Sequence, residues 1–274
     1  MIKTSASITI QYESVFSPFP PAQFSQALEW VKNCGFSGVE LIVCDPQLID
    51  PENIFAQVKK HSLEVSAIAT GQAAGIEGLS MTSPSRYIRE ATRQRLFEDI
   101  DFAVRLGNPK LPKLTIGSLR GKGGALSKHD ELEFLKYELQ IAADYAGKRG
   151  ITINLEPINR YETSLLNSTA SVYEFLESIG SPRNIGILYD TFHSAAEDKD
   201  MAESIRLYGK KITHVHFADS NRRLPGDGHI DFQSIVSALR EVDYTGYVSL
   251  ETLCEPSAKH IIDNAAEQME RITV

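Results

Sequence analysis

Four potential metal ligands lie at the ends of apolar segments in the second half of the chain. Glu156 ends the run INLE, Asp190 ends ILYD, His216 lies in HVHF and Glu251 ends VSLE. Three carboxylates with one imidazole suit Mn²⁺, Mg²⁺ or Co²⁺ better than they suit a thiolate-rich zinc site. The pattern therefore predicts one divalent metal ion, with Mn²⁺ as the first choice.

Each of these residues also has a plainer interpretation. Glu156 could cap a helix or carry a surface charge, and Asp190 could cap the next helix. His214 and His216 alternate along one segment, so they point to the same face of a strand. Only one of them is needed as a ligand, and we choose His216 because it lies nearer the end of the segment. We expect His214 to be a packed, hydrogen-bonded core residue.

Charged side chains in the segments that follow these runs are candidates for binding a substrate. Glu162 follows the letters NRY, and His193 lies three residues beyond Asp190. Arg222 lies in ADSNRRLPGDGHIDF, whose proline and glycine residues indicate a loop. A guanidinium in that loop could hydrogen-bond a sugar oxygen. The plainer alternatives are a salt bridge within the loop for Arg222 and an ordinary loop histidine for His193.

A substrate that carries a carboxylate would need a cationic partner. Arg120 and Lys122 in the segment IGSLRGK are candidates, and so is Arg223 beside Arg222. Arginine favours bidentate contacts with carboxylates. The alternative is that these side chains are solvated loop charges.

Eight short apolar runs must position these side chains, and they alternate with amphipathic runs of helical length. Most of the short runs are apolar on both faces, which is typical of parallel strands that helices cover. The expected strands are residues 5–10, 38–43, 63–70, 111–117, 152–156, 185–190, 212–218 and 247–251. The expected helices are residues 23–33, 86–106, 131–148, 171–178, 201–208, 232–242 and 258–272, with Ser168 and Asp231 as N-caps.

This alternation predicts a (β/α)8 TIM barrel, formed as a single domain by residues 1–274. A doubly wound open sheet is the structural alternative, but no GxGxxG motif follows the first expected strand. In a TIM barrel, functional side chains lie at the C-terminal ends of the strands. The four potential ligands occupy such positions on four successive strands, which chance would not arrange.

The composition narrows the class of protein. The chain has 274 residues, 42% hydrophobic residues and a net charge of −8, which suits a globular protein and does not suit the binding of a nucleic-acid backbone. Three widely spaced cysteines without a CxxC motif favour a reducing compartment over a disulfide framework. Neither a signal peptide nor a membrane-spanning apolar stretch is visible, so the expected location is the cytoplasm.

The motifs LEPINRYE, ILYDTFH, HVHFADSNRRLPGDGHIDF and SLE resemble the D-tagatose 3-epimerase/D-allulose 3-epimerase family, which belongs to the xylose-isomerase-like TIM barrels. The resemblance covers nearly the whole chain and implies these metal ligands: Glu156, Asp190, His216 and Glu251. It implies that both glutamates also form the acid–base pair, and that the chain assembles as a dimer or tetramer. The substrate contacts that it implies are Glu162, His193 and Arg222.

A narrower resemblance appears in the N-terminal half. The segments AIATGQAAGIEGLSMTSP and IGSLRGK are similar to the 5-keto-L-gluconate epimerase branch, which serves inositol breakdown. The implied substrate is 5-keto-L-gluconate, converted to D-tagaturonate, or a ketohexose such as D-tagatose or D-allulose. Ser194, Ala195 and Ala196 depart from the Met-Asn-Ile of many relatives. These three residues could touch the substrate, so the departure leaves the exact specificity open.

The reaction implied by this resemblance is the epimerisation of a carbon next to a ketone. A divalent metal would stabilise the enediolate that forms when the carbon loses its proton. Two glutamates on opposite faces, one acting as base and the other as acid, would invert that carbon. The alternatives are an aldose–ketose isomerase of the hydroxypyruvate isomerase type, an inosose dehydratase, and a sugar-binding barrel without catalysis. An apurinic endonuclease fits less well because the net charge is −8.

Overall fold

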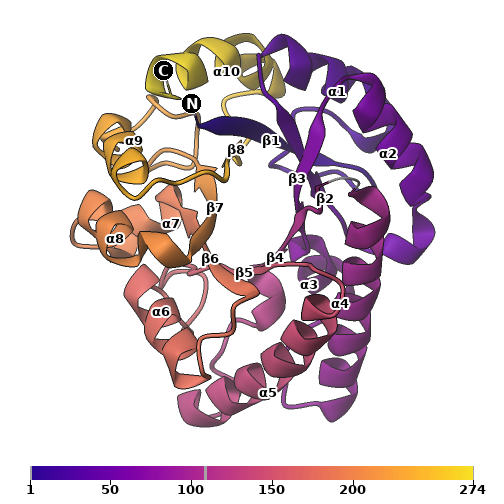
Figure 1. The fold of residues 1–274 in the computed structure, drawn as a ribbon, viewed down its shortest axis with the longest axis vertical. Helices are drawn as coiled ribbons and strands as arrows, with labels where there is room; N and C mark the ends of the chain where they lie inside the picture. The colour runs from indigo at the N-terminus through magenta and orange to yellow at the C-terminus, as the bar shows by residue number, and fades with distance from the viewer. Residues whose placement is uncertain (1, 108–109, 274) are drawn as a thin grey trace.

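The computed structural model describes residues 2–107 and 110–273. Eight parallel strands pair in chain order and β8 pairs with β1, so the sheet closes into a barrel (Figure 1). The strands are β1 (Lys3–Thr9), β2 (Gly38–Ile42), β3 (Glu64–Ala69), β4 (Lys113–Ile116), β5 (Ile153–Leu155), β6 (Ile185–Asp190), β7 (Ile212–Phe217) and β8 (Tyr247–Leu250). The predicted (β/α)8 TIM barrel is thereby confirmed.

Helices surround the barrel as the outer ring in Figure 1. They are α1 (Phe24–Asn33), α2 (Pro51–Lys60), α3 (Gly71–Glu77), α4 (Arg86–Leu106), α5 (Lys128–Gly147), α6 (Thr169–Ser178), α7 (Thr191–Glu197), α8 (Met201–Tyr208), α9 (Phe232–Glu241) and α10 (Ala258–Thr273). Short 3-10 helices lie at Pro21–Gln23, Pro46–Leu48, Ser118–Arg120 and Gly209–Lys211. The strands are buried on both faces because the barrel interior covers one face and the helices cover the other.

All seven expected helices are present, and α2, α3 and α7 are additional. Ser168 and Asp231 cap α6 and α9 as predicted, because their side chains accept hydrogen bonds from backbone N–H groups of the first turn. The start of α2 could also have been predicted from the sequence, because Asp50 is a typical N-cap residue and Pro51 is the first residue of the helix. The helices α3 and α7 have seven residues each, too few for a clear apolar period.

The barrel interior contains several polar side chains. Ser7 is paired in register with Glu40, Asp190 with His216, and His216 with Ser249. Residues in register on neighbouring parallel strands point to the same side of the sheet. Since Glu40 contacts His216 across the barrel, this set points inward. A polar interior of this kind can hold charged ligands that an apolar barrel could not.

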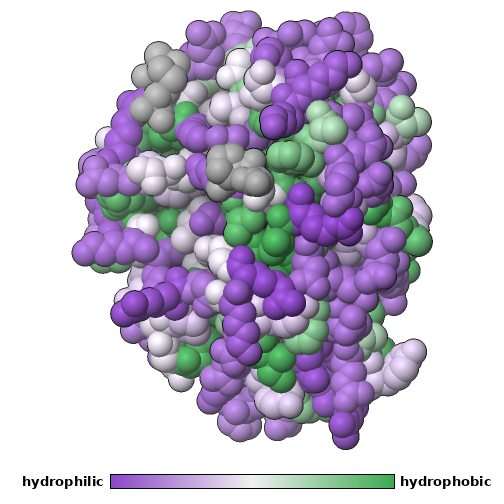
Figure 2. Space-filling model, turned by 45° about the vertical axis from the view of Figure 1, so that its right-hand side comes forward, coloured by the Kyte–Doolittle hydropathy of each residue, from purple (hydrophilic) through white to green (hydrophobic). Residues whose placement is uncertain are grey.

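The outer surface shows no single apolar face in the view of Figure 2, where hydrophilic side chains predominate and hydrophobic ones form small separate patches. This distribution agrees with the charged residues making up 23% of the sequence. Within residues 2–107 and 110–273, none of the helices has both the length and the apolar character needed to cross a bilayer.

A buried carboxylate on the outer helix α4 has no hydrogen-bond partner within the described residues. It belongs to Asp99, which is 1% exposed. Burial raises the pKa of Asp99 well above the usual value for an aspartate. The folded chain therefore holds this proton more tightly than the unfolded chain does. The contribution of Asp99 to the free energy of unfolding is largest below about pH 4 and is lost as the pH rises through the raised pKa.

Replacing Asp99 with asparagine is expected to raise the free energy of unfolding at pH 8 by roughly 1–3 kcal/mol, because the neutral amide requires neither a buried charge nor a proton taken up on folding. The gain should shrink toward pH 3, where the aspartic acid is mostly neutral in both states. Urea denaturation at both pH values measures the effect, and Asp144→Asn on the exposed side of α5 is the matched control. A gain of equal size at both pH values would contradict the assignment.

Candidate active site

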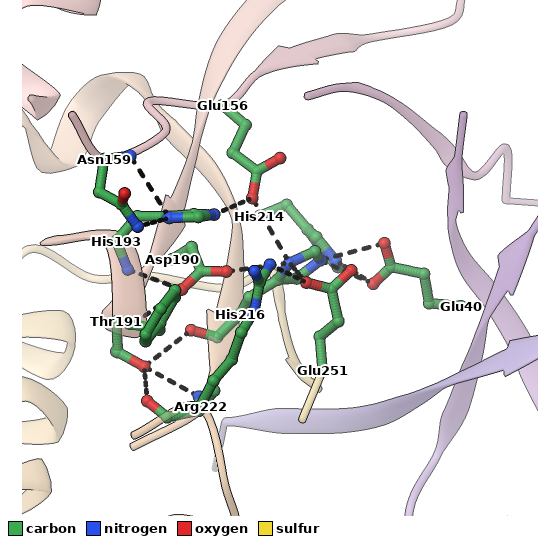
Figure 3. A network of polar contacts seen from close by, with 12 residues as sticks. Glu40, Glu156, Asn159, Asp190, Thr191, His193, His214, His216, Arg222 and Glu251 are labelled. Atoms are coloured by element: carbon green, nitrogen blue, oxygen red, sulfur yellow. Dashed lines mark hydrogen bonds and ion pairs between the residues drawn. The ribbon is translucent and has the colours of Figure 1, made fainter. Parts of the chain in front are cut away.

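Four neighbouring strands bring the predicted ligands to one end of the barrel. Glu156 directly follows β5, Asp190 ends β6, His216 is the penultimate residue of β7, and Glu251 directly follows β8. One potential ligand atom from each of these residues lies within 4.8 Å of the other three. Figure 3 shows the three carboxylates converging around the imidazole. The structure therefore brings together all four residues that the sequence singles out.

His216 lies at the centre of this group. Its Nδ1 is 3.3 Å from Glu251 Oε2, 3.7 Å from Asp190 Oδ2 and 4.0 Å from Glu156 Oε1. The Nδ1 atom and Asp190 Oδ2 are buried, and neither has a hydrogen-bond partner in the part of the chain that is described. Buried polar atoms seldom lack a partner, and one divalent cation among these side chains would satisfy both atoms. The donor set therefore fits the predicted metal ion.

The crowding of carboxylates changes the protonation of the group. Burial and the neighbouring charge of Glu251 raise the pKa of Glu156 to about 8. Burial alone would lower the pKa of His216, but the carboxylates of Glu40 and Glu251 outweigh it and raise that pKa well above its ordinary value. Protons on Glu156 and His216 thus offset negative charge in the metal-free chain. A bound cation would displace these protons.

Asp190 serves a helix as well as this group. Its Oδ1 accepts hydrogen bonds from the backbone N–H groups of Phe192 and His193, at 2.7 and 3.2 Å. These bonds cap α7 and leave Oδ2 directed toward His216. The interpretation of Asp190 as a helix cap and its interpretation as a ligand are therefore compatible, because they use different oxygens of one carboxylate.

The connection after β4 holds Glu156 in place. Arg120 donates a hydrogen bond from Nη1 to the backbone carbonyl of Glu156. A Cβ at Gly117 would lie 2.1 Å from Glu156 Oε2, so only glycine leaves room for this carboxylate. Arg120 itself is completely buried and lines neither cavity at this end of the barrel. The structure gives Arg120 a supporting role in place of the predicted contact with a substrate carboxylate.

A cavity of about 200 Å³ opens beside the four potential ligands. Its walls include three of them and all three predicted substrate contacts, namely Glu156, His216, Glu251, Glu162, His193 and Arg222. The Arg222 guanidinium lies between the rings of Phe16 and Phe192, 4.6 and 4.8 Å from the ring centroids. Its Nη1 is 3.2 Å from Glu162 Oε1. Aromatic contacts and an ion pair thus fix a planar donor at the cavity wall.

His193 is a neutral donor at the same wall. Burial lowers its pKa below the ordinary value for histidine. The backbone N–H of Asn159 points at Nδ1 from 3.4 Å, and the Asn159 side-chain nitrogen lies 2.8 Å from it. Because a backbone N–H can only donate, Nδ1 accepts and the hydrogen of the neutral ring lies on Nε2. This Nε2 is 3.8 Å from Glu156 Oε1, so it can donate to a molecule in the cavity.

A second cavity of about 610 Å³ adjoins the first. The two cavities share these wall residues: Gly71, Ser118, Ile158 and Glu162. Lys122 lines the second cavity, within the same cleft as the ligand group. Arg223 instead forms a surface ion pair with Glu255 at 3.0 Å. Residues 194–196 lie in α7 and line neither cavity, so the expected contact of this segment with a substrate is absent from both walls.

The geometry of the barrel and its strand ends agrees with a comparison to known families. Residues 28–273 match the model of the xylose isomerase-like TIM barrel family. The chain belongs to this family. The match spans every strand except β1 and includes all four potential ligands.

Several relatives of this xylose isomerase-like barrel are named as epimerases or isomerases. An L-ribulose 3-epimerase of Methylomonas sp. (strain DH-1) is 29% identical over 83% of this chain and 77% of the relative. A 3-dehydro-D-guloside 4-epimerase and a hydroxypyruvate isomerase, both of Escherichia coli (strain K12), are 26% and 28% identical, each over 85% of this chain and over 88% and 89% of the relatives. A solved structure of L-ribulose 3-epimerase has a TM-score of 0.83 and 25% identity, covering 99% of this chain and 93% of the other. The chain is therefore an enzyme of the epimerase and isomerase type.

One buried carboxylate beside the ligand group of this xylose isomerase-like barrel was not singled out from the sequence. Glu40 in β2 is completely buried, and its Oε2 lies 2.8 Å from His214 Nε2. His214 is thus the packed, hydrogen-bonded core residue that the sequence predicts. Glu40, His214 and His216 lie close enough to hold a metal, but their N···O distances of 2.8 to 3.1 Å are those of hydrogen bonds. The available signal was a lone charged residue inside the apolar run GVELI.

Proposed function

We propose that this chain is a divalent-metal-dependent epimerase that inverts the carbon next to the ketone of a keto-sugar. The observation that carries the proposal is the group of four potential ligand atoms within 4.8 Å of one another, two of them from glutamates that line a cavity. Glu156, Asp190, His216 and Glu251 would hold the metal, with Mn²⁺ as the expected ion. A cation at this position would supply Lewis-acid stabilisation to the oxygens of the ketone and of the neighbouring hydroxyl.

The two glutamates would move the proton. In one direction, Glu156 or Glu251 accepts the proton of the carbon next to the ketone, and the other glutamate protonates the opposite face. The reverse direction exchanges their roles, which makes the reaction reversible. Arg222 and His193 would donate hydrogen bonds to the oxygens that gain negative charge in the enediolate. The aromatic rings of Phe16 and Phe192 fix Arg222 before a substrate arrives.

The proposed substrate is 5-keto-L-gluconate, with D-tagaturonate as its product, or a ketohexose such as D-tagatose or D-allulose. The names of the L-ribulose 3-epimerase and the 3-dehydro-D-guloside 4-epimerase support a keto-sugar in general. Lys122 in the adjoining cavity supports an acid in particular, because its ammonium could pair with the substrate carboxylate. The second candidate function is an aldose–ketose isomerase, which the similarity to a hydroxypyruvate isomerase favours.

These two functions are distinguished by their products in D₂O. The Mn²⁺-loaded enzyme is incubated there with each of four substrates: 5-keto-L-gluconate, D-tagatose, D-allulose and hydroxypyruvate. The expected NMR result is an epimer that carries deuterium at the inverted carbon. An aldose product, or turnover of hydroxypyruvate alone, would replace the epimerase with the isomerase. Absence of turnover with the whole panel, despite bound metal, would leave a sugar-binding barrel.

Lys122 provides a test of the acid substrate. Replacing it with methionine is expected to raise KM for 5-keto-L-gluconate about 10-fold, because one charge-assisted contact is lost. KM for a neutral ketohexose should change little. Steady-state kinetics on both substrates measure the difference, and Lys128→Met at the exposed start of α5 is the control. Equal changes for both substrates would show that Lys122 does not recognise a carboxylate.

A further inference from the structure

The buried carboxylate of Glu40 contacts Nε2 of His216, the ring nitrogen that faces away from the other three potential ligands. Both of its oxygens lie near His216 Nε2, Oε1 at 3.0 Å and Oε2 at 3.1 Å. The other ring nitrogen, Nδ1, faces Glu251, Asp190 and Glu156. Figure 3 shows Glu40 on one side of the imidazole and Asp190 on the other. The ring thus joins Glu40 to the proposed metal ligands.

The chemistry of a carboxylate decides which nitrogen carries the hydrogen. An ionised carboxylate only accepts hydrogen bonds, so His216 Nε2 must donate and carries a hydrogen. In a neutral imidazole, the remaining lone pair is then on Nδ1. That atom is the one directed at the three carboxylates, and it is buried without a hydrogen-bond partner in the described chain. Hydrogen bonding on one side of the ring therefore determines the donor on the other side.

We propose that Glu40 is a positioning residue that holds His216 in the tautomer with its hydrogen on Nε2, so that Nδ1 presents a lone pair to the cation. This inference rests on the proposed function, because it assumes that a cation binds at the four ligands. Partners of this kind outside the ligand set fix the orientation and tautomer of metal-binding histidines in many sites.

His214 has a place in the same arrangement. Its Nε2 lies 2.8 Å from Glu40 Oε2 and also donates a hydrogen there. The two imidazole rings are 5.3 Å apart and nearly perpendicular, at 81°, so they approach the carboxylate from different directions. His214 thereby satisfies and orients Glu40, which in turn orients His216. This role explains why a second histidine on β7 faces the barrel interior without lining the cavity of the ligand group.

Glutamine is a weaker replacement for Glu40 in this arrangement. Because both carboxylate oxygens lie within 3.1 Å of His216 Nε2, either orientation of a glutamine amide places its NH₂ group against that nitrogen. The amide oxygen can still accept from Nε2, but it carries no full negative charge, and the NH₂ group now offers a donor that favours the other tautomer, in which Nε2 accepts and Nδ1 carries the hydrogen. In that tautomer Nδ1 has no lone pair for a cation. We therefore expect Glu40→Gln to weaken metal binding without removing any ligand.

The first experiment titrates Mn²⁺ into the metal-free protein by calorimetry, with no substrate present. Glu40→Gln is expected to raise Kd for Mn²⁺ about 10- to 100-fold, while kcat at saturating Mn²⁺ stays within a few-fold of the wild-type value. Glu40→Asp keeps the acceptor and should bind more tightly than the glutamine variant. Glu138→Gln removes an equally buried carboxylate outside the barrel and should leave Kd unchanged. An unchanged Kd in Glu40→Gln would overturn the proposal.

The second experiment does not need a stable variant. In ¹⁵N-histidine-labelled wild-type protein loaded with diamagnetic Mg²⁺, the two-bond ¹H–¹⁵N spectrum should show His216 with its hydrogen on Nε2. A hydrogen on Nδ1 in that spectrum would refute the inference directly. If the wild-type protein binds no divalent metal at all, the proposed function itself fails. If wild type and Glu40→Gln bind equally well, only the role of Glu40 fails.

Discussion

Glu251→Gln and Glu156→Gln are each expected to lower kcat for epimerisation by about 10³-fold, within the usual range for loss of a general acid or base. The glutamine amide retains an oxygen for the metal but cannot accept or deliver the proton at the substrate carbon. Both glutamates should be needed, since inversion requires removal of a proton from one face and delivery to the other. Steady-state kinetics at saturating Mn²⁺, with the bound metal measured in the same samples, provide the test.

Isotope exchange distinguishes the role of Glu156 from that of Glu251. Each variant should still exchange the proton of the epimer whose hydrogen faces the surviving glutamate, without forming the other epimer. The control is Glu255→Gln, which changes the same functional group four residues from Glu251, where Glu255 pairs with Arg223 at the surface. Near-normal turnover by Glu156→Gln or Glu251→Gln with metal bound would contradict a mechanism that uses both carboxylates.

Removal of the metal is expected to abolish epimerisation, and added Mn²⁺ should restore it. Binding should also stabilise the folded chain, by about 2.7 kcal/mol when free Mn²⁺ is 100 times Kd. Mn²⁺ affinity should increase with pH between about pH 6 and 8, because the pKa of Glu156 is raised to about 8 and that of His216 is also raised in the metal-free chain. Below these pKa values, a cation must displace protons before it can bind.

Calorimetry in buffers of different ionisation enthalpy measures the released protons, and thermal melts with and without Mn²⁺ measure the stabilisation. Circular dichroism of the chelated sample serves as the control, since the barrel should remain folded. Full activity after exhaustive chelation would contradict the requirement for a metal. A Kd that does not depend on pH would contradict the assigned protonation of Glu156 and His216.

Sequence patterns were sufficient where structure depends on local periodicity. The eight strands are short apolar runs, and Glu156, Asp190 and Glu251 end or directly follow three of them. Parallel strands in a closed barrel bring equivalent ends together, so the convergence of the four potential ligands could be anticipated. The capping residues Ser168 and Asp231 were also recognisable, because a cap depends only on its next three residues.

Contacts between distant segments could not be anticipated in the same way. Glu40 meets His214 and His216 across sequence separations of 174 and 176 residues, and no local pattern specifies that pairing. Arg120 looked like a loop cation, yet the 3-10 helix that contains it turns the side chain inward to the carbonyl of Glu156. Burial of a long side chain depends on how the loops pack, and periodicity does not describe loops.

The two oxygens of Asp190 have different partners, and this has a consequence for which metal ion the chain binds in the cell. Its Oδ1 accepts hydrogen bonds from the first turn of α7, so its Oδ2 is directed toward His216 before any ion binds. On the proposed function, three carboxylates and one imidazole accept several divalent ions, because the set contains no thiolate that would select a soft metal. Intrinsic affinities follow the Irving–Williams order, which ranks zinc and copper above manganese. The ion recovered with this chain would therefore reflect the nutrient supply of its host more than any preference of the protein.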